Sequence, residues 1–187
     1  MDSTTTSAGT TAPAPLGQVD GVQAREVLPV TFTLTAVSSG KRRNDVRVRM
    51  TEPWPLREWE LASDEAPAHG GEETAPKPLG IFATGIATCF MTQVRTFSRA
   101  CGVRVDGLQV EGRFEWQLKP GPRPRDPYTA ETGVFHLDIN MDTQSPMDDQ
   151  QRLIAAAARG CFAEAVLKVP VMHRLKTDYG WVNCDVD

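Results

Sequence analysis

The sequence lacks the short motifs by which several large enzyme classes are recognised. It contains no Walker phosphate-binding loop, no GxGxxG dinucleotide fingerprint and no nucleophile-elbow serine. It has no CxxC pair, and its histidines, His69, His136 and His173, are scattered without the spacing of metal ligands, which argues against a zinc site. We therefore expect neither a nucleotide cofactor nor a bound metal.

A membrane-length hydrophobic run and an excess of basic residues are also missing. The uncharged stretch 78–94 is interrupted by glycine and threonine and falls short of the about 20 mostly apolar residues that a bilayer requires. A net charge of -4 argues against a general nucleic-acid binder, whose phosphate contacts need a basic face. The N-terminus lacks the basic start and apolar core of a secretory signal, so we expect a cytoplasmic protein.

What remains is the composition of one globular domain preceded by a tail. With 187 residues, of which 40% are hydrophobic and 24% charged, the chain suits a single well-buried core. Residues 1–25 are rich in Thr, Ser, Ala, Gly and Pro without apolar periodicity, and we expect them to form a flexible tail. Residues 26–187 are expected to form a single domain.

Hydrophobic periodicity predicts several strands and two long helices. Spacings of three and four predict a helix from about Leu79 to Ala100, with Gly102 suited to the left-handed position beyond its end. A second helix is expected over about 146–168, with Ser145 as its N-cap. The order of strands, helix, strands, helix and strand indicates an α+β fold. Alternation of apolar and polar residues predicts the strands 30–36, 46–50, 59–62, 107–118, 134–141 and 169–176.

Four cysteines are the residues best able to carry chemistry: Cys89, Cys101, Cys161 and Cys184. In a cytoplasmic chain of this size we expect free or redox-active thiols rather than a structural disulfide framework. Cys89 lies in the first predicted helix, on a stripe of uncharged hydrogen-bonding residues that includes Gln93, and Cys161 lies on the inner side of the second helix. For any one thiol taken alone, packing as a small hydrophobic residue is the competing interpretation.

The residues around two of these cysteines resemble a known family. "PLGIFATGIATCF", residues 78–90, is similar to the stretch around the first cysteine of the OsmC/Ohr superfamily, and "AAARGCFAEAVL", residues 156–167, is similar to its second cysteine helix. "SDEAPAHGG", residues 63–71, resembles the loop before the first helix, and the resemblance covers about residues 28–184. It implies an intertwined homodimer of α+β subunits, with mixed sheets packed on two central helices.

The resemblance also implies a function, the reduction of organic hydroperoxides by two thiols. The cysteine matching Cys89 attacks the hydroperoxide and becomes a sulfenic acid, which the cysteine matching Cys161 resolves as a disulfide. An arginine from the first hairpin normally places its positive charge beside the attacking thiol, and Arg42 or Arg43 is the candidate here. The partners implied are an apolar hydroperoxide, a dithiol reductant and a second subunit, with no nucleic acid and no membrane.

The chain departs from the family pattern beside both cysteines. Members with peroxidase activity usually have a glutamate just after the proline matching Pro78, which holds the arginine over the thiol, whereas here leucine and glycine follow. The second cysteine is commonly followed by proline, whereas here the helix is expected to continue and to place Glu164 beside Cys161. Either Glu72, Glu73 or Glu164 replaces the arginine tether, or the peroxidase activity has been lost. The candidate binding residues beside the two catalytic thiols are Arg42, Arg43, Gln93 and Glu164.

Two other functions remain open on these residues. One thiol could act as a nucleophile in acyl transfer with His173 as the candidate base, although nothing in the sequence places that histidine near either cysteine. Alternatively, the protein could bind a small molecule at the dimer interface without catalysis and use its cysteines only for packing. Peroxide-dependent loss of two thiols would favour the peroxidase, and stoichiometric acylation of a thiol would favour the acyl-transfer enzyme. Thiols that react with neither reagent would favour the binding protein.

Overall fold

The computed structural model describes residues 27–167, and the backbone of residues 173–177 and 180–184. The tail expected at residues 1–25 lies outside the described residues. The chain divides into two compact units, which are considered separately. The first takes the chain up to Ala36 together with 46–61, and the second takes 37–45 together with 62–187.

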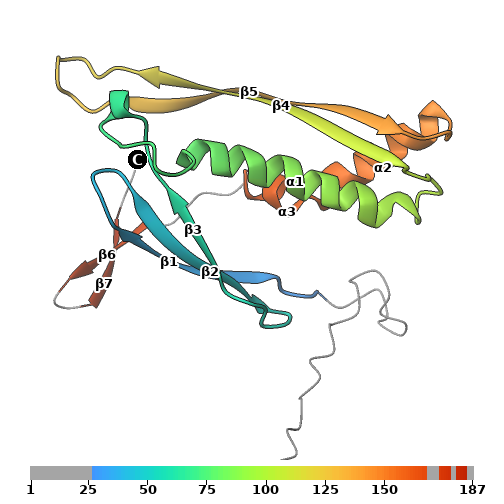
Figure 1. The fold of residues 1–187 in the computed structure, drawn as a ribbon, viewed down its shortest axis with the longest axis horizontal. Helices are drawn as coiled ribbons and strands as arrows, with labels where there is room; N and C mark the ends of the chain where they lie inside the picture. Colours follow the sequence, from blue (N-terminus) through green and yellow to red (C-terminus); the bar gives the residue numbers. More distant parts are fainter. Residues whose placement is uncertain (1–26, 168–172, 178–179, 185–187) are drawn as a thin grey trace, which may run out of the picture. The chain divides into compact units, whose positions relative to one another are not determined.

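The first unit is built on three strands that the sequence pattern predicts. They are β1 (Thr31–Ser38), β2 (Asn44–Glu52) and β3 (Trp59–Ser63), and they form one sheet in the order β1-β2-β3 (Figure 1). The tip between β1 and β2 and the last residues of β3 belong to the second unit. This division matters because the basic residues 41–43 lie at that tip, and their contacts can therefore be described within the second unit.

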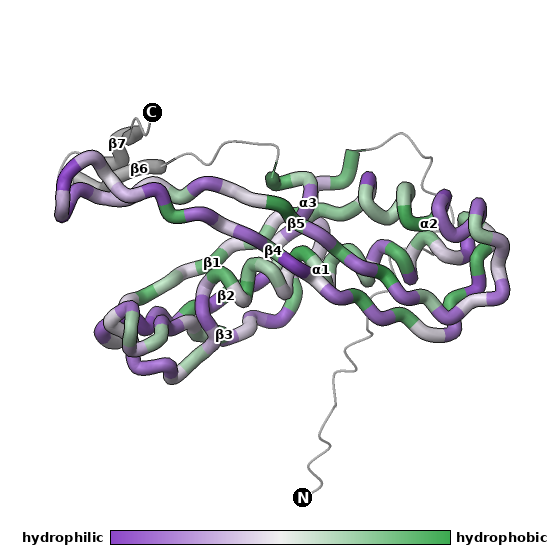
Figure 2. The backbone as a smooth tube through the Cα atoms, turned by 90° about the horizontal axis from the view of Figure 1, so that it is seen from above, coloured by the Kyte–Doolittle hydropathy of each residue, from purple (hydrophilic) through white to green (hydrophobic). Residues whose placement is uncertain are grey.

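The second unit contains all the helices. Its elements in chain order are η1 (Pro67–His69), α1 (Pro78–Ser98), β4 (Gly107–Lys119), β5 (Thr129–Asp142), α2 (Met147–Gly160), α3 (Phe162–Val166), β6 (His173–Thr177) and β7 (Gly180–Cys184). The strands β4 and β5 pair antiparallel, with a shift of register between Phe114 and Trp116, and β6 pairs antiparallel with β7. Hydrophobic and hydrophilic residues alternate along β4 and β5, so the hairpin has one apolar face (Figure 2).

The first helix agrees with the sequence prediction within two residues at each end. Pro78 occupies its first turn, where a missing N–H costs nothing, and Gly102 adopts the expected left-handed conformation with φ of 69°. The strand expected at 169–176 is observed from His173 onward, and its partner β7 was not predicted.

The second helix differs from the prediction of one continuous helix over 146–168. Cys161 has an extended conformation, with φ of -76° and ψ of 110°, so α2 ends at Gly160 and α3 begins at Phe162. Glycine is a weak helix former, and this one is also pressed against an aromatic ring of α1. The start differs too, because Pro146, rather than Ser145, is the N-cap. The predicted continuous helix is therefore wrong at the cysteine itself.

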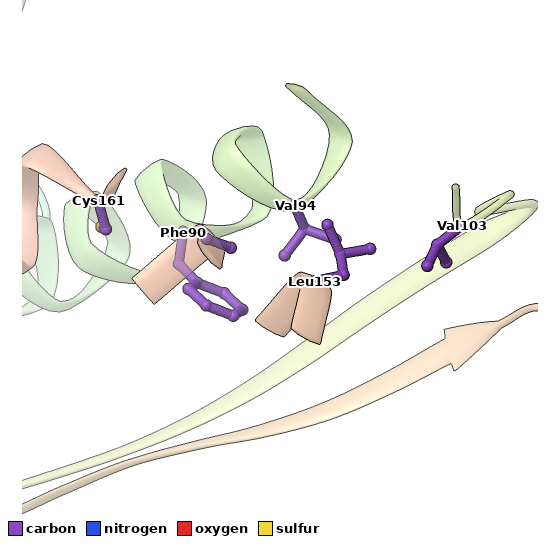
Figure 3. Packing of buried hydrophobic residues seen from close by; sticks show 6 residues of the cluster. Phe90, Val94, Val103, Leu153 and Cys161 are labelled. Carbon is purple, nitrogen blue, oxygen red and sulfur yellow. The ribbon is translucent and has the colours of Figure 1, made fainter. Parts of the chain in front are cut away.

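The core of the second unit lies between the two long helices and the apolar face of the hairpin. Fully burying a side chain such as that of Leu153 stabilises the fold by about 1.5–3 kcal/mol. The buried residues of this cluster are Phe90, Val94, Val103, Leu153, Ala157 and Cys161 (Figure 3). The hairpin residues packed against them are Leu108, Val110, Leu137, Ile139 and Met141. The architecture is thus α+β, as expected. None of the helices in the described ranges has the length and apolar character needed to cross a membrane.

Candidate functional site

The two cysteines singled out by the sequence meet in this core. Cys161, at the junction of α2 and α3, is only 1% exposed, whereas Cys89 on α1 is half-buried and packs against the same cluster. The neighbouring Cys89 thiol raises the pKa of Cys161, so the two side chains lie close enough to interact. Both are free thiols. The structure therefore brings the two sulfur atoms together from different helices.

The electrostatic environment makes the two thiols unequal. Burial above all, together with the neighbouring Cys89 and the charge of Glu164, raises the pKa of Cys161 to about 11, although the backbone N–H of Glu164 acts in the opposite direction. The thiolate is the reactive form of cysteine, and the raised pKa keeps the resting Cys161 mostly protonated at neutral pH. The more exposed Cys89 is therefore the thiol that a reagent from solution can meet first.

The raised pKa of Cys161 predicts a dependence of stability on pH. Because its pKa in the folded protein, about 11, exceeds the ordinary value of 9.0, the unfolded chain releases this proton first as the pH rises. The contribution to stability is complete below pH 9.0 and lost as the pH rises to about 11. We expect Cys161→Ala to lose this part of the pH dependence of the free energy of unfolding, as measured by urea unfolding of the reduced proteins. A stability difference between the two proteins that stays constant through this window would contradict the prediction.

One polar side chain beside Cys89 is free to interact with a ligand. The hydroxyl groups of Thr88, Thr92 and Thr96 each donate to the carbonyl four residues earlier in α1, so the helix itself satisfies them. Gln93, one turn after Cys89, has no side-chain hydrogen bond within the described residues. Its Oε1 atom would lie 3.8 Å from a Cβ placed on Gly160, which directly precedes Cys161. Gln93 therefore lies next to the residue that precedes Cys161, and its role as a binding residue stays a prediction.

The two candidate arginines are held differently from the expectation. Arg43 donates to the hydroxyl of Thr74 at 3.0 Å and pairs with Asp45 at 2.9 Å. Glu72 pairs with Lys41 at 3.1 Å instead of with an arginine. Within the described part of the chain, neither arginine forms a hydrogen bond or ion pair with Cys89. The residues that hold Arg43 are thus not the glutamates considered from the sequence.

Asp64 organises the loop that holds Arg43, and the sequence analysis missed it. Its side chain is 1% exposed and accepts hydrogen bonds from the N–H and hydroxyl groups of Thr74, at 3.0 and 2.8 Å, and from the N–H groups of Glu65 and Glu72. These bonds, that of the Thr74 N–H foremost, hold the pKa of Asp64 below its usual value. An aspartate between a strand and a Gly-Gly loop is the signal that could have identified it.

Other candidate groups are placed as follows. In the ranges that the structure describes, no group of three or more His, Cys, Asp or Glu side chains is arranged to hold a metal ion. The side chains of His173 and Cys184 lie outside the described residues, so the acyl-transfer hypothesis gains no base from the structure. Cys101, near the end of α1, is a half-buried free thiol packed against the core.

Comparison with known proteins shows one consistent likeness. The family model described as OsmC-like protein matches residues 70–176, a range that contains both Cys89 and Cys161. The crystal structure of an OsmC-like hydroperoxide resistance protein from Jannaschia sp. CCS1 is 35% identical, with 83% of this chain and 98% of that chain covered and a TM-score of 0.54. The OsmC-like protein from Mycoplasma pneumoniae is 16% identical, with coverages of 74% and 87% and a TM-score of 0.52, and shows likeness of fold alone. A search of curated proteins found no match.

Proposed function

Because the chain belongs to the OsmC-like protein family, we propose that it reduces organic hydroperoxides with the thiols of Cys89 and Cys161. The observation that carries this proposal is the thiol pair itself, in which the buried Cys161 interacts with the more exposed Cys89. The name of the similar Jannaschia protein, a hydroperoxide resistance protein, supports the choice of substrate. Free thiols also fit a reducing, cytoplasmic setting.

The proposed reaction runs in three balanced steps. The Cys89 thiolate attacks one peroxide oxygen, the O–O bond breaks, and the leaving alkoxide takes a proton and departs as an alcohol. Cys89 is then a sulfenic acid, and the sulfur of Cys161 displaces its oxygen, which leaves as water while the disulfide forms. A dithiol reductant then reduces this disulfide by thiol–disulfide exchange. The reductant is oxidised to a disulfide, and both protein thiols are restored. No cofactor is needed.

The neighbouring polar groups are assigned supporting roles. The carboxamide of Gln93 can donate a hydrogen bond to the peroxide, because no other described group occupies it. Burial above all keeps Cys161 protonated in the resting protein, and the negative charge of Glu164 adds to this effect. Arg42 and Arg43 remain the candidates for the cation beside Cys89. Because Arg43 is tied to Thr74 and Asp45, we expect slower reaction with peroxide than in members that keep the glutamate tether.

Intact-mass measurement tests the proposal directly. One equivalent of cumene hydroperoxide should remove two alkylatable thiols and two hydrogen atoms from the fully reduced protein. Peptide mapping should place the new disulfide between Cys89 and Cys161. Unchanged thiols after peroxide would refute the peroxidase, and stoichiometric modification by an activated acyl ester would then favour the acyl-transfer enzyme. If the thiols react with neither the peroxide nor the acyl ester, the result would favour a binding protein.

We further propose that the protein works as a homodimer. Large apolar side chains of the second unit are exposed, among them Phe162 at 62%, Leu118 at 61% and Leu79 at 53%. Surfaces of this kind usually mark an interface. Sedimentation at micromolar concentration is expected to show a species of twice the chain mass. A stable folded monomer of 20.5 kDa would contradict the prediction.

A further inference from the structure

A pocket lies between the end of α1 and one face of α2. Its volume is about 390 Å³, which is within the range of sites that hold small molecules. It is separate from the thiol pair, because α1 continues for about 13 Å along its axis from Cys89 to its end at Ser98. The residues that line it are Ala100, Cys101, Arg152, Ala155, Ala156 and Arg159. None of these residues has a part in the proposed reaction.

The pocket residues of α2 share one face of that helix. They follow one another at intervals of three, one and three residues, whereas Leu153 and Ala157 are buried on a neighbouring face that packs in the core. The two arginines lie about 10 Å apart along the helix axis. Between them the floor is apolar, because it consists of alanine methyl groups and the thiol of Cys101.

The two arginines differ in the charge that they offer to a ligand. Arg152 pairs with Asp149 at 2.7 Å, so a carboxylate of the same helix already balances its charge. Arg159, in the last turn of α2, forms no ion pair and no side-chain hydrogen bond within the described residues. The carbonyl groups of residues 97–99, at the end of α1, already accept backbone hydrogen bonds. Arg159 is therefore the cation of this pocket that is available to an anion.

We propose that this pocket, called here the Arg159 pocket, binds a small organic carboxylate that carries an apolar chain. The carboxylate accepts hydrogen bonds from the guanidinium group of Arg159, which can donate two in parallel. The chain lies on the alanine methyl groups and removes them from water. Both parts are needed, since a solvent-exposed ion pair alone contributes little. The site is additional to the proposed peroxidase activity and does not depend on it.

Titration calorimetry of the reduced protein with octanoate tests the charge. Octanoate should bind, and Arg159→Gln should weaken its binding about tenfold, because a charge-assisted hydrogen bond is lost. Octanol, which lacks the charge, should bind equally to the wild type and to this variant. Arg125→Gln is the matched control. It removes the same charge from the loop after β4, and β4 leads away from the end of α1 for 13 residues, about 40 Å.

Thiol alkylation locates the bound octanoate. The reduced protein is treated with iodoacetamide, and peptide mapping follows the alkylation of Cys101 and Cys89 separately. Octanoate at ten times its measured Kd should slow alkylation of Cys101 about tenfold in the wild type. At the same concentration Arg159→Gln should lose most of this protection. Ala155→Leu should lose it too, because the larger side chain fills the floor, and Ala155 is exposed, so the core packing is kept.

Three results would overturn the inference. The first is the absence of octanoate binding to the wild type, and the second is an equal loss of affinity in Arg159→Gln and Arg125→Gln. The third is protection of Cys89 without protection of Cys101, which would place octanoate at the thiol pair. All of these measurements use the resting protein without peroxide. A failure of the peroxidase proposal therefore leaves them unchanged, and the two proposals can fail separately.

Discussion

Replacing Cys89 with serine is expected to reduce hydroperoxide consumption to the rate in buffer alone. A serine hydroxyl keeps nearly the shape of the thiol, but its oxygen is a far weaker nucleophile than a thiolate and cannot form a disulfide. The other member of the pair cannot take over the first step, because burial holds its pKa at about 11. The loss should be visible as unchanged peroxide concentration in a coupled assay with excess dithiol.

Replacing Cys161 with serine should stop the reaction at a later step than replacing Cys89. The variant keeps the attacking thiol, so it should consume the first equivalent of peroxide and then stall as a sulfenic acid, which dimedone can trap. Cys101→Ser is the control, because Cys101 is a free thiol near the end of α1, and no described contact links it to the pair. Its turnover should be nearly that of the wild type, and so should that of Cys184→Ser.

The two serine variants together decide the assignment of roles. If the wild type and Cys89→Ser remove organic hydroperoxide at the same rate, the peroxidase proposal is wrong. If Cys89→Ser stalls after one equivalent while Cys161→Ser is inert, the pair is correct but the attacking and resolving thiols are exchanged. The second result would mean that the protonated, buried thiol becomes exposed before it reacts.

The strands other than β7 and the first helix could be predicted from the sequence because each has a clear hydrophobic period. Along β4, apolar residues alternate with polar ones over most of residues 107–118, and one face of that pattern packs on the core. The break at Cys161 could not be predicted in this way, because the alanine-rich sequence around it favours helix. At this break Gly160 lies against the ring of Phe97 on α1, and the local sequence carries no record of that contact.

The site shows the same division between local pattern and tertiary contact. The two thiols were identified by family resemblance, since spacing along the chain does not show that two helices meet. The hydrogen bonds that link Asp64 through Thr74 to Arg43 form because a loop folds back, which no local pattern shows. The family resemblance pointed to a glutamate as the group that holds the arginine. The stripe of uncharged residues beside Cys89 indicates groups that can hydrogen-bond to a ligand, yet a helical threonine can satisfy its hydroxyl with its own backbone, as Thr92 does.

The close packing of α1 against α2 at Gly160 leads to the second large expected effect. A Cβ atom at Gly160 would lie 2.5 and 2.7 Å from two ring carbons of Phe97, a residue that packs against the core. Gly160→Ala should therefore displace the ring or the turn that carries Cys161, at a cost of about 1–3 kcal/mol in the free energy of unfolding. Because Cys161 is the next residue, formation of its disulfide after one equivalent of peroxide should also slow.

Urea unfolding and the lifetime of the dimedone-reactive sulfenic acid measure the two parts of this prediction. Gly80→Ala provides the comparison, because the space around its Cβ position is open and removing a helical glycine should stabilise the protein by about 0.5–1 kcal/mol. The double variant Gly160→Ala, Phe97→Leu replaces the ring with a smaller side chain. It should recover part of the lost stability and of the lost rate of disulfide formation, since the clash involves the far end of the Phe97 side chain. If Gly160→Ala proves as stable as Gly80→Ala and closes its disulfide at the wild-type rate, then the contact between Gly160 and Phe97 does not position Cys161.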